Sequence, residues 1–167
     1  GADGTASFVR GELGIGVERH DYRQTLFVCT VTPAREHAGR AFERFGDDGP
    51  TALLPLAAHR FGLVLTVTTA EAERVAALDD AGFLALAQRR FGWRLGELTR
   101  PGKRFAYPVQ RVVATQLGAR RAVLVGNAAQ TIHPIGAQGL NLGLRDALTL
   151  AELVAAAADP GAGDVLR

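Results

Sequence analysis

The residues best placed to do chemistry in this sequence lie in one run, residues 123–147. A short apolar stretch leads into Gly126 and Asn127, and Pro134 precedes a glycine-rich stretch at residues 136–139. A glycine lets a ligand approach the backbone closely, and an asparagine amide both donates and accepts hydrogen bonds. The glycine-rich stretch opens a long helical pattern, and a helix N-terminus attracts anions and electron-rich oxygens. The run therefore predicts a binding site for a ligand that carries a hydroxyl group and either an anionic group or an electron-rich oxygen.

A loop that merely starts a helix is the simpler interpretation of any one of these glycines. It fits the whole run poorly, because a strand, Gly-Asn, His-Pro, Gly-x-Gln-Gly, Asn and Arg-Asp follow one another without interruption. Other chemistry has less support in the sequence. The four histidines lack metal-ligand spacing, no Gly-x-Ser-x-Gly occurs, and the single cysteine, Cys29, lies in an apolar run that favours burial.

The run resembles the second FAD-binding motif of the flavin-dependent aromatic hydroxylases, written Gly-Asp, Ala-Ala-His, Pro and Gly-Gln-Gly-x-Asn. Asn127 and Gln130 stand where that family usually has Asp and His. With these two residues the local sequence resembles that of the family's ubiquinone-biosynthesis branch. Residues 136–139 read Gly-Ala-Gln-Gly, with the first two residues of the branch's Ala-Gly-Gln-Gly exchanged. Residues 1–10 resemble the family's other motif, in which an Asp-Gly turn and an Arg serve FAD and NAD(P)H binding. The resemblance extends to about residue 154.

The resemblance implies hydroxylation of an electron-rich, polyprenylated phenol, with FAD as cofactor, NAD(P)H as reductant and O₂ as oxygen source. The cofactor carries the difficult step, so no side chain here is expected to be a catalytic nucleophile. Tyr107 is a candidate for contact with the substrate ring, with core packing as an equal alternative. The residues that the resemblance assigns to FAD binding are Asp3, Arg10, Gly126, Asn127, Ala128, Pro134, Gly136, Ala137, Gln138, Gly139, Leu140 and Asn141.

Two alternatives stay open: another FAD-dependent epoxidase or reductase of the same superfamily, and a non-catalytic fragment without bound flavin. Enzymes of the family begin with Gly-x-Gly-x-x-Gly, which binds the FAD pyrophosphate, and this motif does not occur in the sequence. We therefore interpret the chain as an internal part of such an enzyme, and we expect the chain alone to hold little FAD.

The polyprenyl tail implies a cytoplasmic protein in peripheral contact with the inner membrane, with other ubiquinone-biosynthesis proteins as partners. The sequence has 19 basic and 17 acidic residues, a balance that gives no indication of nucleic acid binding. The arginines look dispersed, as at positions 89, 90 and 94, which favours a solvated surface over a patch for an acidic partner. No apolar run reaches the length of a membrane span.

The surrounding sequence predicts an α+β fold: an antiparallel substrate-domain sheet with helices, flanked by parts of an α/β FAD-binding domain. Alternation predicts strands, and helical periodicity predicts helices. We assign residues 1–20 and 117–167 to the FAD-binding domain and residues 21–116 to the substrate-binding sheet domain. The expected strands are 22–32, 41–45, 51–57, 61–69, 103–116 and a buried one at 121–125, and the expected helices are 70–78, 80–90 and 140–158.

Two packing expectations can be tested directly. The last helix should turn one apolar stripe inward, formed by Leu144, Leu148, Ala151 and either Val154 or Ala155. Trp93 is expected in the core or at an edge of the fold rather than as a stacking platform for a ligand.

Overall fold

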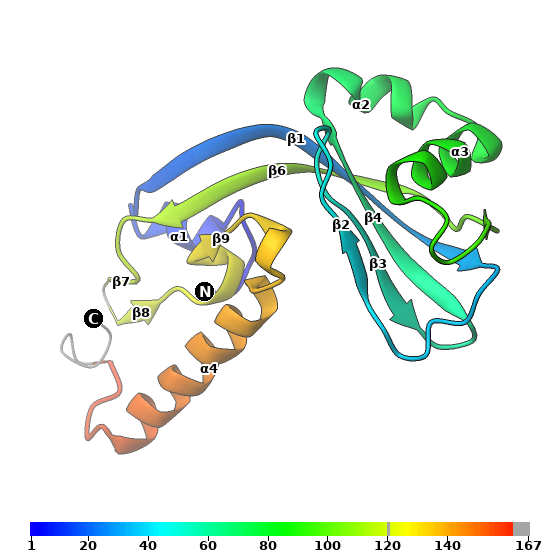
Figure 1. Ribbon diagram of the computed structural model, residues 1–167. Helices are drawn as coiled ribbons and strands as arrows, with labels where there is room; N and C mark the ends of the chain where they lie inside the picture. Colours follow the sequence, from blue (N-terminus) through cyan, green and yellow to red (C-terminus); the bar gives the residue numbers. More distant parts are fainter. Residues whose placement is uncertain (120, 162–167) are drawn as a thin grey trace. The chain divides into compact units, whose positions relative to one another are not determined.

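The computed structural model describes residues 1–119 and 121–161, and the chain divides into two compact units (Figure 1). Unit 1 consists of Gly1–Tyr22 and Gln110–Arg167, and unit 2 of Arg23–Val109. In chain order the elements are α1 (Phe8–Glu12), β1 (Val17–Pro33), β2 (Phe42–Arg44), β3 (Thr51–Leu56), β4 (Arg60–Thr68), α2 (Thr69–Ala76), α3 (Asp80–Phe91), β5 (Leu98–Thr99), β6 (Phe105–Ala114), β7 (Gly118–Ala119), β8 (Ala122–Val123), the 3₁₀ helix η1 (Gly126–Ala128), β9 (Gln130–Thr131), the 3₁₀ helix η2 (Pro134–Gly136) and α4 (Gly139–Ala156).

Unit 2 is an antiparallel sheet covered on one face by two helices. The strand order is β2-β3-β4-β1, with β5 added at the end of β1. Alternate residues of β4 (Phe61, Leu63, Leu65 and Val67) are fully buried. They pack with buried residues of α2 and α3, such as Val75, and both helices lie on this face of the sheet (Figure 1). The period-two pattern in the sequence thus builds the core of this unit.

Polar and glycine signals set the limits of α3. The Asp79 carboxylate accepts a hydrogen bond from the Gly82 amide at 2.7 Å, which caps the start of the helix. Gly92, with φ of 91°, ends the helix in a conformation that side chains disfavour. The buried Gln88 then accepts from the Leu98 amide at 2.8 Å and donates to the Gly96 carbonyl at 3.1 Å. One side chain of α3 therefore fixes the segment that follows the helix.

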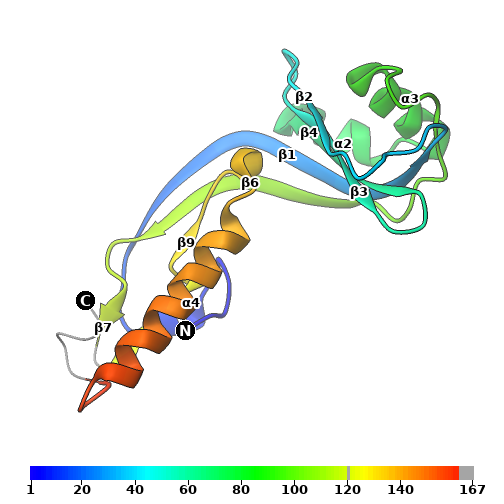
Figure 2. The same ribbon diagram turned by 60° about the horizontal axis from the view of Figure 1, so that its bottom comes forward.

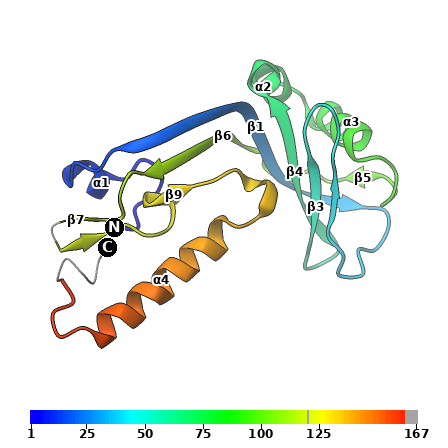
Figure 3. The same ribbon diagram turned by 60° about the vertical axis from the view of Figure 1, so that its left-hand side comes forward.

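Unit 1 has a smaller core and a long helix with little cover. Its apolar cluster comes from the turn after α1, from β6 and from the loop before β9: Ile15, Ala114, Leu124, Ala128 and Ala129. Helix α4 packs against η1 near its own N-terminus and then runs on past β9 (Figures 2 and 3). No described residue of α4 is buried.

The predicted α+β class is confirmed, as are the hairpin of β3 and β4 and the positions of α2 and α3. The burial of Cys29 is also confirmed. Strand β1 begins five residues earlier than residue 22, at Val17. Its first residues are mostly exposed and polar, so hydrophobic alternation gave no signal there.

The predicted buried strand at 121–125 is confirmed only in part, since Leu124 is buried but the strand itself is short. Only Ala122–Val123 form a strand, half-buried and paired with β7 alone. Beyond it, the Leu124 amide bonds the carbonyl of Leu117 at 2.8 Å and the Val125 amide bonds that of Gly1 at 2.9 Å. A short apolar run does not distinguish a strand from a buried connecting segment, because either can bury the same side chains.

The predicted inward face of α4 is also wrong. Leu144 and Leu148 are 54% and 66% exposed, and Ala151, Val154 and Ala155 are exposed as well. The half-buried stripe instead includes Gly143 and Asp146, which face the backbone of η1. Leu142 and Leu150 are half-buried as well, so α4 turns a different set of leucines toward its neighbours than the predicted stripe.

Trp93 is 67% exposed, which excludes the core and leaves the edge of the fold, the other predicted position. It follows Gly92 directly, at the point where the chain leaves α3.

Among the described residues no helix is long and apolar enough to cross a membrane.

Candidate functional site

The candidate site begins at η1, where Gly126 adopts a left-handed φ of +59°. An added Cβ at Gly126 would meet nothing within 4 Å, so the space above this backbone is open to a ligand. The Gly126 amide donates to the Asp146 carboxylate at 3.2 Å, and a Cβ on Gly143 would lie 3.3 Å from the Gly126 Cα. Helix α4 therefore approaches η1 closely and anchors it through Asp146.

Asn127 is exposed at the surface of η1, and Ala128 and Ala129 lie beneath it at 0% and 1% exposure. Within residues 1–119 and 121–161, no hydrogen bond engages the Asn127 side-chain amide. The amide can therefore donate to and accept from a ligand hydroxyl. The two alanines form a small, rigid floor for it.

The turn before α1 carries a compact polar network. The Asp3 carboxylate accepts from the Ser7 hydroxyl at 2.6 Å and from the Val9 amide at 3.0 Å. These two bonds, the one from Ser7 first, lower the pKa of Asp3 from 3.8 to about 2. Ser7 in turn caps α1, because its hydroxyl accepts from the Arg10 amide at 2.9 Å.

Arg10 joins this turn to η1. Its side chain is 6% exposed, and its guanidinium donates to the Ala128 carbonyl at 2.8 Å and to the Thr5 carbonyl at 2.8 Å. The Thr5 hydroxyl is also 2.8 Å from the Thr131 hydroxyl. A buried cation thus holds two sequence-distant loops by their backbone oxygens, which fixes the floor under Asn127.

The start of α4 forms the other side of the candidate site. Pro134 begins η2, and the His133 ring before it accepts from the Ile135 amide at 3.1 Å. Burial lowers the pKa of His133, which favours the neutral ring that this acceptor role requires. Ala137 then takes a left-handed φ of 49°, and no side chain caps α4 at Gln138.

All the residues predicted to bind FAD belong to unit 1, where η1 contacts α4 and is bonded by Arg10 of α1. Tyr107 lies on β6 in unit 2, where its side chain is 52% exposed. Sequence reasoning missed the supporting roles of Thr5, Thr131 and Asp146. Only Asp146 had a sequence signal, as the last residue of the Arg-Asp pair in the motif.

The residues present fit the flavin dinucleotide that the motif implies. The site combines an open glycine, an unengaged surface amide and an uncapped helix N-terminus with exposed residues from Gly136 to Asn141. These groups suit a ligand with hydroxyls and an electron-rich edge. No group of histidine, cysteine or carboxylate side chains among the described residues could hold a metal ion.

Comparison with known proteins identifies the class. The sequence family described as FAD binding domain matches residues 1–166. The match extends over almost the whole chain, so the chain belongs to this family of FAD-binding proteins.

Its relatives include hydroxylases of ubiquinone biosynthesis. Ubiquinone hydroxylase UbiL of Rhodospirillum rubrum is 42% identical over 170 residues, covering 99% of this chain and 40% of that protein. The 3-demethoxyubiquinol 3-hydroxylase of Escherichia coli is 36% identical over 154 residues, covering 92% of this chain and 39% of that protein. The chain thus spans about two fifths of the length of these relatives.

Solved structures show the same fold. PqsL of Pseudomonas aeruginosa, solved with 2-aminobenzoylacetate, is 28% identical with a TM-score of 0.77, over 99% of this chain and 48% of that one. Aklavinone-11 hydroxylase, solved with FAD and aklavinone, has a TM-score of 0.74 at 21% identity, over 93% of this chain and 30% of that one. The second likeness supports the fold alone.

Proposed function

We propose that the protein is an FAD-dependent monooxygenase that hydroxylates the aromatic ring of a polyprenylated phenol in ubiquinone biosynthesis. The observation that carries this proposal is the unengaged Asn127 amide, set on a floor that the buried Arg10 holds in place. The relatives named above support the substrate class, since two are hydroxylases of ubiquinone or a ubiquinol precursor.

In this proposal unit 1 residues hold the cofactor, which supplies the redox chemistry when bound. Asn127 bonds a ribityl hydroxyl, and the neutral amide avoids a second negative charge near the pyrophosphate. The segment from Pro134 through residues 136–141 presents backbone N–H groups to the electron-rich edge of the flavin ring. Arg10 and Asp3 act through the loops that they hold. Residues 1–20 and 117–167 thus serve FAD, and residues 21–116 serve the substrate.

The remaining parts of the proposal concern substrate and surroundings. NAD(P)H supplies the electrons and O₂ the oxygen atom, while Tyr107 contacts the phenol ring. The polyprenyl tail brings the cytoplasmic protein into peripheral contact with the inner membrane, beside other ubiquinone-biosynthesis proteins. A narrower resemblance of the motif, to 2-octaprenyl-6-methoxyphenol hydroxylase, makes that phenol and demethoxyubiquinol the two substrates to compare.

The test is the affinity of the intact enzyme for FAD in three forms: the parent, Asn127→Ala and Asn127→Asp. Loss of one neutral hydrogen bond should weaken binding by about 0.5–1.5 kcal/mol in Asn127→Ala, whereas Asn127→Asp retains an acceptor and should be tolerated. Quenching of flavin fluorescence measures both. Unchanged affinity in Asn127→Ala would mean that Asn127 only forms the turn, and the site would lose its main support.

Product analysis separates the alternatives. The proposed hydroxylase consumes NAD(P)H and O₂ and adds one oxygen atom to a prenylated phenol, with FAD bound. Epoxide formation or reduction without oxygen transfer would assign another reaction of the same superfamily. An intact protein without a flavin absorbance band would favour the non-catalytic alternative.

A further inference from the structure

Basic residues gather in one stretch of unit 2, residues 89–104. This stretch holds six of the chain's 19 basic residues and only one of its 17 acidic residues, Glu97. The rest of the chain therefore has three more acidic than basic residues. The near-neutral composition hides a local concentration of positive charge.

Internal contacts engage only part of this charge. Arg90 lies 3.3 Å from Asp48, and Arg104 lies 3.6 Å from Asp80 and donates to a backbone carbonyl. Arg94 stacks over the ring of Phe42. The other three form no ion pair among the described residues, and all three are exposed: Arg89, Arg100 and Lys103. Of these, Lys103 lies over the ring of Phe105, 5.2 Å from its centre.

Two of these exposed cations line an apolar groove between α3 and the segment that follows it. The groove has a volume of about 630 Å³, and Trp93, Leu84, Ala85 and Leu98 supply its apolar walls. Arg89, Arg100 and the single acidic residue, Glu97, line it as well. We call it the Trp93 groove.

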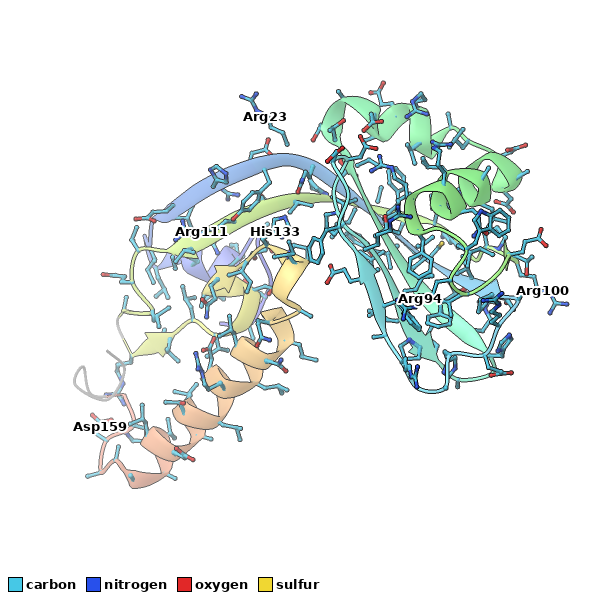
Figure 4. All side chains as sticks on the ribbon, viewed as in Figure 1. Arg23, Arg94, Arg100, Arg111, His133 and Asp159 are labelled. Carbon is cyan, nitrogen blue, oxygen red and sulfur yellow. The ribbon has the colours of Figure 1, made fainter. Side chains whose placement is uncertain are left out.

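Hydrogen bonds hold the segment that forms one wall of the Trp93 groove in place. Gln88 holds the segment at Gly92, Gly96 and Leu98 by hydrogen bonds, so the groove does not depend on a loose loop. The backbone carbonyl of Arg100 accepts a hydrogen bond from the Arg60 guanidinium at 3.2 Å. The side chain of Arg100 points away from the rest of unit 2 (Figure 4).

We propose that the Trp93 groove and its cations are the surface by which the protein docks on an anionic phospholipid membrane. An exposed indole beside apolar walls suits the boundary between headgroups and acyl chains, where tryptophan is enriched. Guanidinium groups at the rim pair with lipid phosphates, and their long stems can lie along apolar surface. Positive charge concentrated on an otherwise slightly acidic chain orients this face toward the membrane.

The docking proposal rests on the proposed function for one premise, that the substrate resides in a membrane. Vesicle binding tests the surface without any measurement of activity. If vesicle binding fails while the intact enzyme still hydroxylates a short-chain phenol, the docking surface is refuted and the function stands. If vesicle binding succeeds but the intact enzyme hydroxylates no phenol, the docking surface stands and the proposed function is refuted.

The experiment uses the whole chain with two kinds of vesicle, phosphatidylcholine alone and phosphatidylcholine mixed with phosphatidylglycerol. Trp93 is the only tryptophan of the chain, so its emission reports on this groove alone. We expect a blue shift and co-sedimentation with the anionic vesicles only. The double variant R89Q/R100Q should bind more weakly by about fivefold for each charge removed, and Trp93→Ala should lose affinity without any change in charge.

The matched control is R19Q/R40Q, which removes two exposed positive charges outside the groove. It should retain most of the affinity of the parent. Equal losses of vesicle affinity in the two double variants would mean that net charge alone drives binding, and would overturn the proposal. A blue shift that depends on protein concentration in the absence of vesicles would overturn it in favour of a second copy in the groove.

Discussion

Unit 2 and unit 1 are stabilised by different interactions. In unit 2 the buried side chains of β4 and of both helices form one continuous apolar cluster. In unit 1 the apolar cluster is small and α4 buries no described residue. The loops of the candidate site are joined by hydrogen bonds that Arg10 donates, and the Asp3 carboxylate accepts bonds within the turn before α1. Apolar burial is worth about 25 cal/mol per Å², so the larger apolar cluster makes the hydrophobic contribution to stability greater in unit 2.

The difference shows how this chain separates stability from binding. The candidate site needs backbone groups and amides that a ligand can reach, and an apolar core would cover them. A buried cation that bonds carbonyl oxygens fixes such loops while leaving their outer faces open. The predictions below test this contrast between the two units.

The largest effect should come from the core of unit 2. Leu65 is fully buried, so Leu65→Ala removes apolar contacts and leaves a cavity, at a cost of about 3 kcal/mol. Urea unfolding of unit 2 measures the loss. The same substitution in unit 1, Leu148→Ala, should cost less than about 0.5 kcal/mol, since Leu148 is 66% exposed. Similar losses would contradict the contrast.

Arg10 should be the most sensitive side chain of unit 1. Arg10→Met keeps an unbranched apolar stem but leaves the Ala128 and Thr5 carbonyls without their donor, at a cost of about 2 kcal/mol. Hydrogen exchange at the amides of Ala128 and Ala129 should accelerate accordingly. Arg19→Met, at an exposed position, should leave these rates unchanged. Unaltered exchange in Arg10→Met would show that the loops hold without it.

Replacement of Ala137 by glycine should raise the stability of unit 1. An L-residue with φ of 49° is strained, so Ala137→Gly should stabilise unit 1 by about 1 kcal/mol. Ala147→Gly, the same change inside α4, should instead destabilise it by about 1 kcal/mol because glycine weakens a helix. Thermal unfolding distinguishes the two signs, and two losses would mean that Ala137 is not strained.

The smallest effect should be a change in the stability of unit 1 at low pH. The pKa of Asp3 falls from 3.8 to about 2 on folding, so its contribution to stability is fully present above about pH 4 and is lost as pH falls toward 2. Asp3→Asn should flatten this part of the pH profile of unit 1. Asp159, whose pKa Arg121 lowers to about 2, acts in the same range, so Asp159→Asn is the control for that second contribution (Figure 4). A profile that Asp3→Asn leaves unchanged would exclude Asp3.

Local patterns in the sequence were enough for much of this protein. Alternation from Phe61 to Val67 predicts β4, and Asp79 and Gly92 mark the two ends of α3. The order of residue types from Gly126 to Asn141 was enough to predict an FAD-binding segment, and the family match confirms the cofactor class.

Tertiary structure decided what these segments contact. The sequence does not reveal that Arg10 is buried, that Asp146 anchors η1, or that Trp93 lies open beside unengaged arginines. Nor does it reveal which stripe of α4 faces η1, since the apolar period of the helix points to another. Periodicity reports which side chains can be buried together on one element. Burial itself depends on the surface that packs against that element, and distant residues supply this surface only once the chain has folded.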